Sequence, residues 1–411
     1  MFERVAQAYG WPCFGGEAEL RSLAYHVGLR DGIRKDGPSQ SARTMILERT
    51  EESFLSAKWS IPDDFLSYEH YVRVVGNLDW GSSPGYPYMR RHPTNRDMFA
   101  VVDGVPAEQR LLHVWDIIQD RLRERDSDPI RLFVKPEPHK IKKLQDGRYR
   151  LISSVSVIDQ ILDHMLFGEM NSSLIANWPF VPSKAGWNQY QGGWRMMPSS
   201  GKWMALDKQS WDWTVQMWIL EMVLEIRCRL CCNLTEEWRE LAVWRYRQLF
   251  SSPEFITSGG MVFRQKFPGV MKSGCVNTIA DNSIAQVILH NRVCQEIDEQ
   301  PGLICCMGDD TLQEIPVKSQ EYLDVIANYC IIKPPVYKVE FAGMQFHGHR
   351  VEPSYRGKHA YTLLHVDPQV LPQLANSYAL LYHRSECRDL MEDLLLKMGQ
   401  EVQSRQVRDA I

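Results

Sequence analysis

The spacing of apolar and polar positions predicts short strands and longer helices in the second half of the chain. An apolar run over residues 203–206 ends at Asp207, and residues 213–228 then show the periodicity of a long amphipathic helix. A second apolar run over 303–307 reaches a turn at 308–311, after which the pattern continues as another strand. We therefore expect strands from two distant stretches that both end at acidic residues.

Further elements follow from the same two periodicities. We expect helices over 151–169, 273–293, 320–329 and 372–398, the last with a break near Ser385, a strand over 261–267, and a hairpin between 341–346 and 349–351. Residues 1–130 mix short helical stretches with Gly/Pro-rich loops and are expected to be irregular and loop-rich. The order strand, helix, helix, hairpin, helix predicts an α+β subdomain followed by a helical terminal subdomain.

The composition is that of a globular enzyme with several subdomains. The 411 residues are too many for one simple core, so we expect two or three subdomains that share an interior. Hydrophobic residues make up 44% and charged residues 24%, which argues against disorder. Because the formal net charge is −4, a surface that binds nucleic acid must come from local clusters of Lys and Arg.

The ten cysteines lack the regular spacing of a disulfide framework, which favours a reducing compartment. Cys228 and Cys231 have a spacing that zinc sites use, but no second pair follows at a usable distance, so we expect buried thiols. The first residues lack a basic stretch followed by an apolar core, and no window approaches 18 uninterrupted apolar residues. No segment is expected to enter a membrane by itself.

Gly308, Asp309 and Asp310 place two adjacent carboxylates at the tip of a predicted hairpin. Alone, such a triplet indicates only a turn, because Asp and Gly tolerate the backbone angles that turns require. Asp207 changes this interpretation, since it also ends an apolar strand, and acidic groups from two strand ends can converge on metal ions. Phosphoryl transfer in polymerases uses two Mg²⁺ ions about 3.5–4 Å apart, held by hard oxygen ligands.

Polar residues on the predicted helix over 273–293 form a second candidate group. Thr278 and Asn282 are four residues apart, so they share one face and can address the same ligand. An N-capping Ser273 with polar residues on a solvated face explains the pattern equally well. If Asn282 faces Asp212, the pair offers a donor and an acceptor to a ribose 2′-OH, the group by which a protein tells RNA from DNA.

Residues 131–150 form a basic segment in an acidic chain. They hold seven Lys or Arg and two acidic residues, a net charge of +5. A solvated charge run is the simpler explanation, but the interleaved Val, Ile, Leu and Tyr suggest that one edge packs while the basic edge faces a polyanion. A triphosphate and a template backbone are both candidates for that polyanion.

These stretches, taken together and in this order, resemble the RNA-dependent RNA polymerases of positive-strand RNA viruses, most closely the sobemovirus-like (solemovirus) polymerases. The resemblance is carried by FVKPEPHKIKKLQDGRYRLISSVSVIDQILDHMLFG, LDKQSWDWTV, SGCVNTIADNS and MGDD, and it spans roughly residues 79–346. It implies an α+β right-hand fold with fingers, a palm built from an antiparallel sheet backed by helices, and a small helical thumb. The implied division is the N-terminal region and fingers over 1–155, 171–199 and 229–268, palm over 156–170, 200–228 and 269–350, and thumb over 351–411.

The resemblance also implies roles for individual residues. The metal-binding catalytic residues would be Asp207, Asp309 and the auxiliary Asp310, with two Mg²⁺ ions as cofactor and Mn²⁺ as a substitute. The NTP- and ribose-binding residues would be Lys135, Arg148, Arg150, Asp212, Ser273, Thr278 and Asn282. The RNA-binding residues would be Ser83, Gly85, Lys140 and Lys143. A lysine would donate a proton to pyrophosphate, and Lys333 and Lys338 both qualify. Lys333 is preferred. An ordinary surface lysine without a catalytic role explains either residue nearly as well.

The activity implied is RNA-templated RNA synthesis for a viral genome. The implied partners are RNA template, product strand, NTPs and other viral replication proteins, such as a genome-linked protein (VPg) or a membrane-anchored protein, on membrane-associated complexes in the host cytoplasm. Two rival explanations use the same residues: a palm polymerase that makes DNA, and a non-enzymatic RNA-binding protein with an inactive palm. Asp212 with Asn282 argues against the first rival, and the complete carboxylate set argues against the second.

Overall fold

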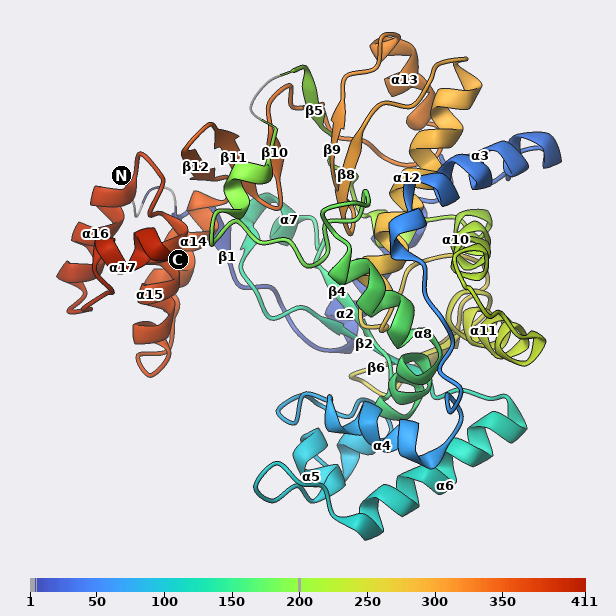
Figure 1. Cartoon of the computed structure of the whole chain (residues 1–411). Helices are drawn as coiled ribbons and strands as arrows, with labels where there is room; N and C mark the ends of the chain where they lie inside the picture. The colour runs from blue at the N-terminus through green and yellow to red at the C-terminus, as the bar shows by residue number, and fades with distance from the viewer. Residues whose placement is uncertain (1–3, 5, 199–200) are drawn as a thin grey trace.

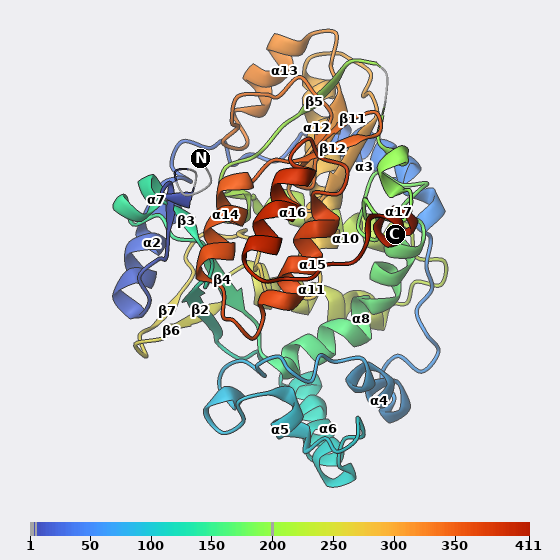
Figure 2. The same cartoon turned by 90° about the vertical axis from the view of Figure 1, so that its left-hand side faces the viewer.

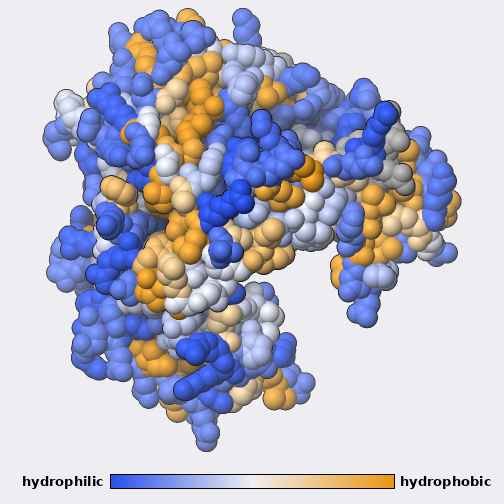
Figure 3. Space-filling model, turned by 180° about the vertical axis from the view of Figure 1, so that it is seen from behind, coloured by the Kyte–Doolittle hydropathy of each residue, from blue (hydrophilic) through white to orange (hydrophobic). Residues whose placement is uncertain are grey.

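The structure is a computed structural model that describes residue 4, residues 6–198 and residues 201–411. The chain forms a lobe of strands and helices at the top, a helical lobe at the bottom, and a helical lobe at the side that holds the last residues (Figure 1). Seen from behind, an open cleft separates the side lobe from the bottom lobe (Figure 3). The expected boundary between residues 199 and 200 lies outside the described residues.

A three-stranded antiparallel sheet and two helices build the top lobe. The strands are β5 (Trp203–Ala205), β8 (Ile304–Met307) and β9 (Asp310–Glu314), in the spatial order β5-β9-β8. Helix α12 (Thr278–Glu296) packs against β8, and α13 (Ser319–Ile326) packs against α12. The apolar runs predicted as strands and the helices predicted beside them are confirmed.

Three long helices fill the interior next to this sheet. They are α8 (Val157–Ala176), α10 (Met217–Arg229) and α11 (Glu236–Phe250). The helix predicted over 213–228 is therefore present as α10, preceded by the short helix α9 (Trp211–Thr214). Their apolar residues belong to one continuous core, which matches the expected shared interior.

The helices predicted over 151–169 and 273–293 begin later than predicted, at Val157 and Thr278. One strand explains both differences. Residues 151–154 alternate between buried and half-buried positions as strand β4 (Leu151–Ser154), which pairs with β2 (Ile130–Val134). Ser153 on β4 accepts a hydrogen bond at its carbonyl from Gly274 N (3.0 Å) and donates its own N–H to Ser273 Oγ (3.1 Å). The loop before α12 is thus bound to a strand, so α12 begins only after it.

A second sheet carries the basic segment. Its order is β4-β2-β6-β7, with β6 (Glu254–Thr257) parallel to β2 and β7 (Val262–Arg264) antiparallel to β6. Strand β7 lies within the predicted strand over 261–267. The segment continues as β3 (His139–Lys140) and α7 (Ile141–Gln145), and β3 pairs with β1 (Tyr9–Gly10).

The helical stretches expected among the loops of residues 1–130 are present, and they give this region more regular structure than predicted. The described part of this region contains α2 (Gly16–Gly28), α3 (Gln40–Ser53), α4 (Tyr68–Gly76), α5 (Asn95–Phe99) and α6 (Glu108–Glu124). Ser39, Ser67 and Thr94 start α3, α4 and α5 by accepting a hydrogen bond from the backbone N–H three residues later. Burial in the main core stabilises helices this short, which their own apolar periodicity signals only weakly.

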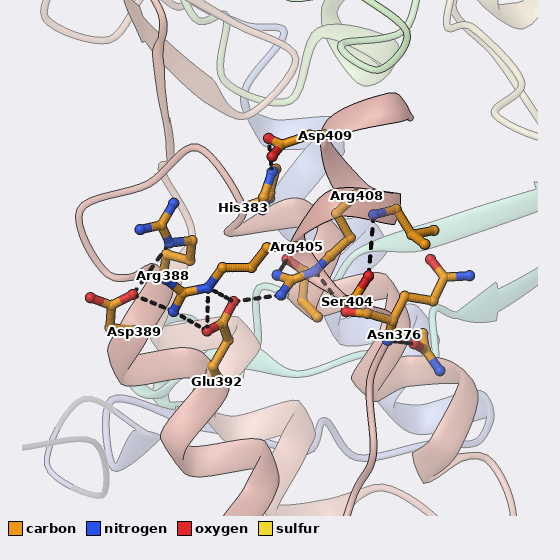
Figure 4. A network of polar contacts seen from close by, with 12 residues as sticks. Asn376, His383, Arg388, Asp389, Glu392, Ser404, Arg405, Arg408 and Asp409 are labelled. Atoms are coloured by element: carbon orange, nitrogen blue, oxygen red, sulfur yellow. Dashed lines mark hydrogen bonds and ion pairs between the residues drawn. The ribbon is translucent and has the colours of Figure 1, made fainter.

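The side lobe has a small core of its own. Its helices are α14 (Arg356–His365), α15 (Leu371–Leu381), α16 (Arg388–Lys397) and α17 (Arg405–Ala410). Leu363, Ala375, Ala379, Tyr382, Met391 and Leu395 form the core. Glu392 on α16 binds both Arg405 and Arg408 of α17, and Arg408 also donates to Ala379 O (2.9 Å), which fixes α17 on the lobe (Figure 4). The break predicted near Ser385 lies between α15 and α16, as expected.

A small antiparallel sheet precedes this lobe along the chain. It consists of β10 (Glu340–Phe341), β11 (Met344–His347) and β12 (Arg350–Pro353), so the hairpin predicted over 341–351 is confirmed. Phe341 and Phe346 lie in a second apolar cluster with Leu312 of β9. This cluster joins the small sheet to the top lobe.

All ten cysteines are free thiols, in agreement with the expected absence of a disulfide framework. Cys228 is buried as predicted, whereas Cys231 is only half-buried and lies against Asn233. Among the described residues, no helix combines the length and the apolar character that crossing a membrane requires.

One buried ion pair joins three helices of the interior. Arg227 on α10 and Asp281 on α12 are both fully buried and lie 2.7 Å apart. Tyr246 on α11 donates its hydroxyl to Asp281 (2.8 Å) and accepts from Arg227 (3.1 Å). A buried charge is tolerated only when it is paired and hydrogen-bonded, so these three side chains depend on one another.

We expect Asp281→Ala to lower the free energy of unfolding by about 3–5 kcal/mol, because it leaves the Arg227 guanidinium buried without a counter-charge. Unfolding of the purified variant in urea measures the change. The control is the double variant Arg227→Met with Asp281→Leu, which removes both charges and should recover most of the loss. A single variant as stable as the wild type would contradict the role of this pair.

Candidate active site

The pairing of β5 with β9 brings the predicted acidic residues to one end of the top sheet. Leu206 N donates to Thr311 O (3.1 Å), and Thr311 Oγ1 donates back to Leu206 O (2.9 Å). Asp207 directly follows Leu206, and Asp310 directly precedes Thr311, so the two residues leave neighbouring backbone positions. Since paired strands lie about 4.8 Å apart, the structure brings together the two stretches predicted to converge.

Burial and neighbouring carboxylates raise the pKa of Asp309 and Asp310 at this end of the sheet. Burial, followed by the charges of Asp309 and Asp207, raises the pKa of Asp310 to about 6. Burial and the charge of Asp207 also raise the pKa of Asp309. Mutual repulsion of this kind is relieved by a bound cation. The geometry is therefore that of a site that favours positive charge.

Lys333 supplies a positive charge at Asp207. Its Nζ donates to Asp207 Oδ2, and its backbone N–H donates to Asp207 O (3.0 Å). Lys338, the other lysine that qualified from the sequence, is exposed, and its side chain makes no hydrogen bond or ion pair with the described residues. Within that same part of the chain, no three or more His, Cys, Asp or Glu side chains are arranged to hold a metal ion.

Lys208 is a residue of this site that the sequence did not indicate. It is buried beneath the strand ends, where its Nζ donates to Thr311 Oγ1 (3.1 Å) and Leu206 O (3.4 Å). Burial lowers the pKa of Lys208, while the carboxylates Asp309 and Asp207 are among the groups that raise it. A lysine next to an aspartate normally points to solvent, so only the fold reveals this arrangement.

Asn282 faces Asp212, as the helical spacing predicted. Asn282 Nδ2 donates to Asp212 Oδ1 (2.9 Å), and Trp211 Nε1 donates to Asn282 Oδ1 (2.9 Å). Burial raises the pKa of Asp212 to about 6, Asp309 adds to this effect, and the bond from Asn282 and the charge of Arg150 oppose it. The indole thus fixes the amide so that its N–H points at the carboxylate.

Ser273 and Thr278 contact the backbone of the loop before α12 and do not contact Asp212. Thr278 Oγ1 donates to Lys272 O (2.9 Å), and Ser273 Oγ accepts from Ser153 N (3.1 Å). These two residues shape the loop that leads to Asn282. That Thr278 and Asn282 address one ligand stays a prediction, since the contacts of Thr278 in the structure are with the loop.

The basic segment lies over the carboxylates and is organised by Glu137. Arg150 Nη1 donates to Glu137 Oε1 (2.6 Å), while Lys135 and Lys358 lie 3.4 Å and 2.9 Å from Glu137 Oε2. Burial alone would raise the pKa of Glu137, but Lys358, Arg150 and Lys135 lower it to about 2. The charge of Arg150 in turn opposes the raised pKa of Asp309 and of Asp212.

The remaining predicted residues lie around this segment. Arg148 pairs with Asp146 (2.7 Å). Lys140 is exposed on β3, and Lys143 is on α7, where partial burial followed by nearby cations, Lys333 first among them, lowers its pKa.

Ser83 and Gly85 form a tight loop on the start of α8. Ser83 Oγ accepts from Gly85 N (3.3 Å), and Pro84 O accepts from Val157 N (2.8 Å). Gly85 has a φ of +70°, and a Cβ there would lie 3.1 Å from Val155 O. The position therefore requires glycine, because both its backbone angle and its surroundings disfavour a side chain.

Comparison with known proteins relates the chain to viral polymerases. The family model for "Viral RNA-dependent RNA polymerase" matches residues 63–329. Protein P2-P3 of Poinsettia latent virus is 30% identical over 76% of this chain and 31% of its own length. Replicase polyprotein P2AB of Southern bean mosaic virus is 31% identical over 74% of this chain and 33% of its own length. The chain thus spans about one third of the length of the curated relatives it matches.

The fold is also similar to that of a solved polymerase. The Sicinivirus 3Dpol RNA dependent RNA polymerase superposes with a TM-score of 0.75 at 15% sequence identity, covering 98% of this chain and 91% of that chain. At this identity the match shows the fold alone. The predicted α+β right-hand fold with an antiparallel palm sheet is confirmed, and so is the resemblance from which it was predicted.

The ionisation of Asp212 should make the folded chain less stable as pH rises from about 4 to about 6. An unfolded aspartate has a pKa of about 3.9, whereas that of folded Asp212 is about 6. In this window the folded chain holds a proton that the unfolded chain has released, so raising the pH favours unfolding.

Asp212→Asn keeps the shape of the side chain and an acceptor oxygen for Asn282, but it does not titrate. We expect the stability of this variant relative to wild type to increase by about 2 kcal/mol between pH 4 and pH 7. Urea unfolding at several pH values measures the difference. A difference that stays constant with pH would contradict the raised pKa of Asp212.

Proposed function

Because the chain belongs to the family of viral RNA-dependent RNA polymerases, we propose that it copies an RNA template into RNA from NTPs. The observation that carries this proposal is the acidic end of the palm sheet, with Asp207 beside Asp309 and Asp310 and the basic segment above them. Acidic groups for metal ions next to cations for phosphates are the two requirements of phosphoryl transfer. RNA template, product strand and NTPs are the proposed ligands.

Divalent metal ions serve this family, and the acidic residues of this chain suit them. Asp207 and Asp309 would hold two Mg²⁺ ions, with Asp310 as the auxiliary ligand. The fit rests on the hard oxygen donors of these three carboxylates, on the charges of Asp309 and Asp207 that raise the pKa of Asp310, and on the ammonium of Lys333, a cation that already lies at Asp207. When bound, the metal pair would activate the attacking hydroxyl and neutralise the triphosphate.

The reaction proposed is attack of the RNA 3′ hydroxyl on the α-phosphate of an NTP, with pyrophosphate as the leaving group. Lys135 and Arg148 would bind the phosphates, which positions the α-phosphate and neutralises charge, and Arg150 would cover the incoming base. Lys333 would leave Asp207 and donate a proton to the departing pyrophosphate. Lys338 remains the alternative donor, and its lack of a contact with the carboxylates makes it the weaker one.

Asp212 and Asn282 would recognise the ribose. Their hydrogen bond presents a carboxylate acceptor and an amide together, and both can contact a 2′-OH. An enzyme that makes DNA would instead block this position with a bulky side chain. The contact therefore favours RNA synthesis over the rival polymerase that makes DNA.

Template RNA would pass the loop of Ser83 and Gly85 and the exposed face of Lys140 and Lys143. The relatives include replicase polyproteins, so other viral replication proteins are proposed as partners. Such partners, for example a genome-linked protein or a membrane-anchored protein, would bring the chain to replication complexes on host membranes.

We expect Asp309→Ala to reduce nucleotide incorporation on a primed RNA template by at least about 1,000-fold, because it removes a metal ligand that acts in the transition state. Gel analysis of primer extension with Mg²⁺ and four rNTPs measures the loss, and circular dichroism checks the fold.

The matched control is Asp116→Ala, an exposed carboxylate on α6, which should retain full activity. Incorporation by Asp309→Ala at the wild-type rate would refute the assignment, and a wild type that binds RNA without synthesis would favour the inactive-palm rival.

We expect Asn282→Ala to weaken the preference for rNTPs over dNTPs by roughly tenfold, the effect of losing about one hydrogen bond to the ribose. The ratio of kcat/KM for GTP and dGTP, measured for single-nucleotide addition, reports the preference. Asn77→Ala, at the exposed end of α4, serves as the matched control and should leave the ratio unchanged. An unaltered ratio in Asn282→Ala would remove this residue from ribose recognition.

A further inference from the structure

Helix α2 in the N-terminal region contacts the NTP-binding segment through one face. Ser22, Tyr25 and His26 share this face, because residues three and four apart are neighbours on a helix. Ser22 Oγ donates to Tyr149 O (2.7 Å), and His26 Nε2 lies 3.1 Å from the same carbonyl. Arg148 Nη1 donates to the Tyr25 hydroxyl (3.3 Å), and its guanidinium lies 5.4 Å from the centre of the Tyr25 ring. Figure 2 shows α2 at one edge of the molecule, beside the second sheet.

The same helix also contacts the segment that carries the metal-binding aspartate. Gln209 Nε2 donates to the Tyr25 hydroxyl (3.0 Å), and Gln209 lies two residues after Asp207. Arg30, just after α2, donates to Trp213 O (2.8 Å). Both ends of the segment from Asp207 to Trp213 are thus attached to the N-terminal region.

The Tyr25 hydroxyl lies at the point where these two sets of contacts meet. It accepts one hydrogen bond from Arg148 and one from Gln209, and its own proton has no acceptor among the described residues. A phenol that accepts twice is fully used as an acceptor and keeps one proton to donate. Tyr25 is only partly buried, and its hydroxyl bonds two side chains. It is therefore not an ordinary core hydroxyl that bonds only to the backbone.

We propose that Tyr25 is a positioning residue of the nucleotide site, which holds the guanidinium of Arg148 against the Asp207 segment through Gln209. This inference rests on the proposed function. Among the described residues, the other polar partner of the Arg148 guanidinium is Asp146, 2.7 Å away at the surface. Without the Tyr25 hydroxyl, the guanidinium is held by this exposed ion pair alone, and the phosphates of the incoming NTP lose a preorganised cation.

The variant Tyr25→Phe separates this role from packing, since it keeps the ring against Arg148 and removes only the hydroxyl. We expect the KM for the incoming NTP to rise roughly 3–10-fold, the effect of about one hydrogen bond, while kcat changes less than twofold. Affinity for the template–primer RNA and the unfolding temperature should equal those of the wild type. Single-nucleotide addition to a primed RNA with the full chain gives both kinetic constants.

Two further variants distinguish positioning from a general loss of structure. Gln209→Leu removes the second partner, and its effect on KM should be non-additive with that of Tyr25→Phe, because both break the same connection. Tyr71→Phe is the matched control: its hydroxyl donates to Leu111 O (3.0 Å) in the bottom lobe, so it should lower the unfolding temperature and leave KM unchanged.

An unchanged KM in Tyr25→Phe, or full additivity with Gln209→Leu, would overturn the inference. A wild-type chain that adds no nucleotide would instead refute the proposed function. The two failures are distinguishable, because the first requires an active wild-type enzyme and the second excludes one.

Discussion

Antiparallel pairing between β5 and β9 is the constraint on which the rest of the site depends. The mutual hydrogen bonds of Leu206 and Thr311 fix which residues leave the sheet together, and these are Asp207 on one strand and Asp310 on the other. A shift of one residue would turn these side chains to the opposite face. The buried ammonium of Lys208 bonds to both strands at this level, so it holds the register and lies beneath the charges that the register brings together.

Concentrating carboxylates at a partly buried sheet end has an electrostatic consequence. Burial and mutual repulsion raise the pKa of Asp310 and of Asp212 to about 6, which means that each carboxylate resists ionisation in the metal-free chain. The charge of Lys208 opposes this effect at Asp310, and that of Arg150 opposes it at Asp212. Glu137, with its pKa of about 2, holds Arg150 in place without neutralising it completely. The site therefore contains carboxylates and cations close together, and it suits ligands that carry either sign of charge.

Much of this arrangement could be predicted from the sequence, because it depends on local patterns. The strand ending at Asp207, the hairpin at Asp309 and the spacing that aims Asn282 at Asp212 all follow from periodicities of two and 3.6 residues. Lys208 and Glu137 could not be predicted, since their roles arise from burial and from partners more than 100 residues away. The bounds of the N-terminal helices could not be predicted, because capping and tertiary packing stabilise these helices more than periodicity does.

The basic segment is held from three directions, and this explains how distant parts of the chain bear on one candidate site. Within the segment, Glu137 binds Arg150; from the side lobe, Lys358 binds the same carboxylate. From the N-terminal region, Tyr25 binds Arg148. A segment carrying this much positive charge repels itself, so it keeps one shape only while such external contacts oppose the repulsion. Contacts from the side lobe and from the N-terminal region are thus a condition for holding these cations in one arrangement.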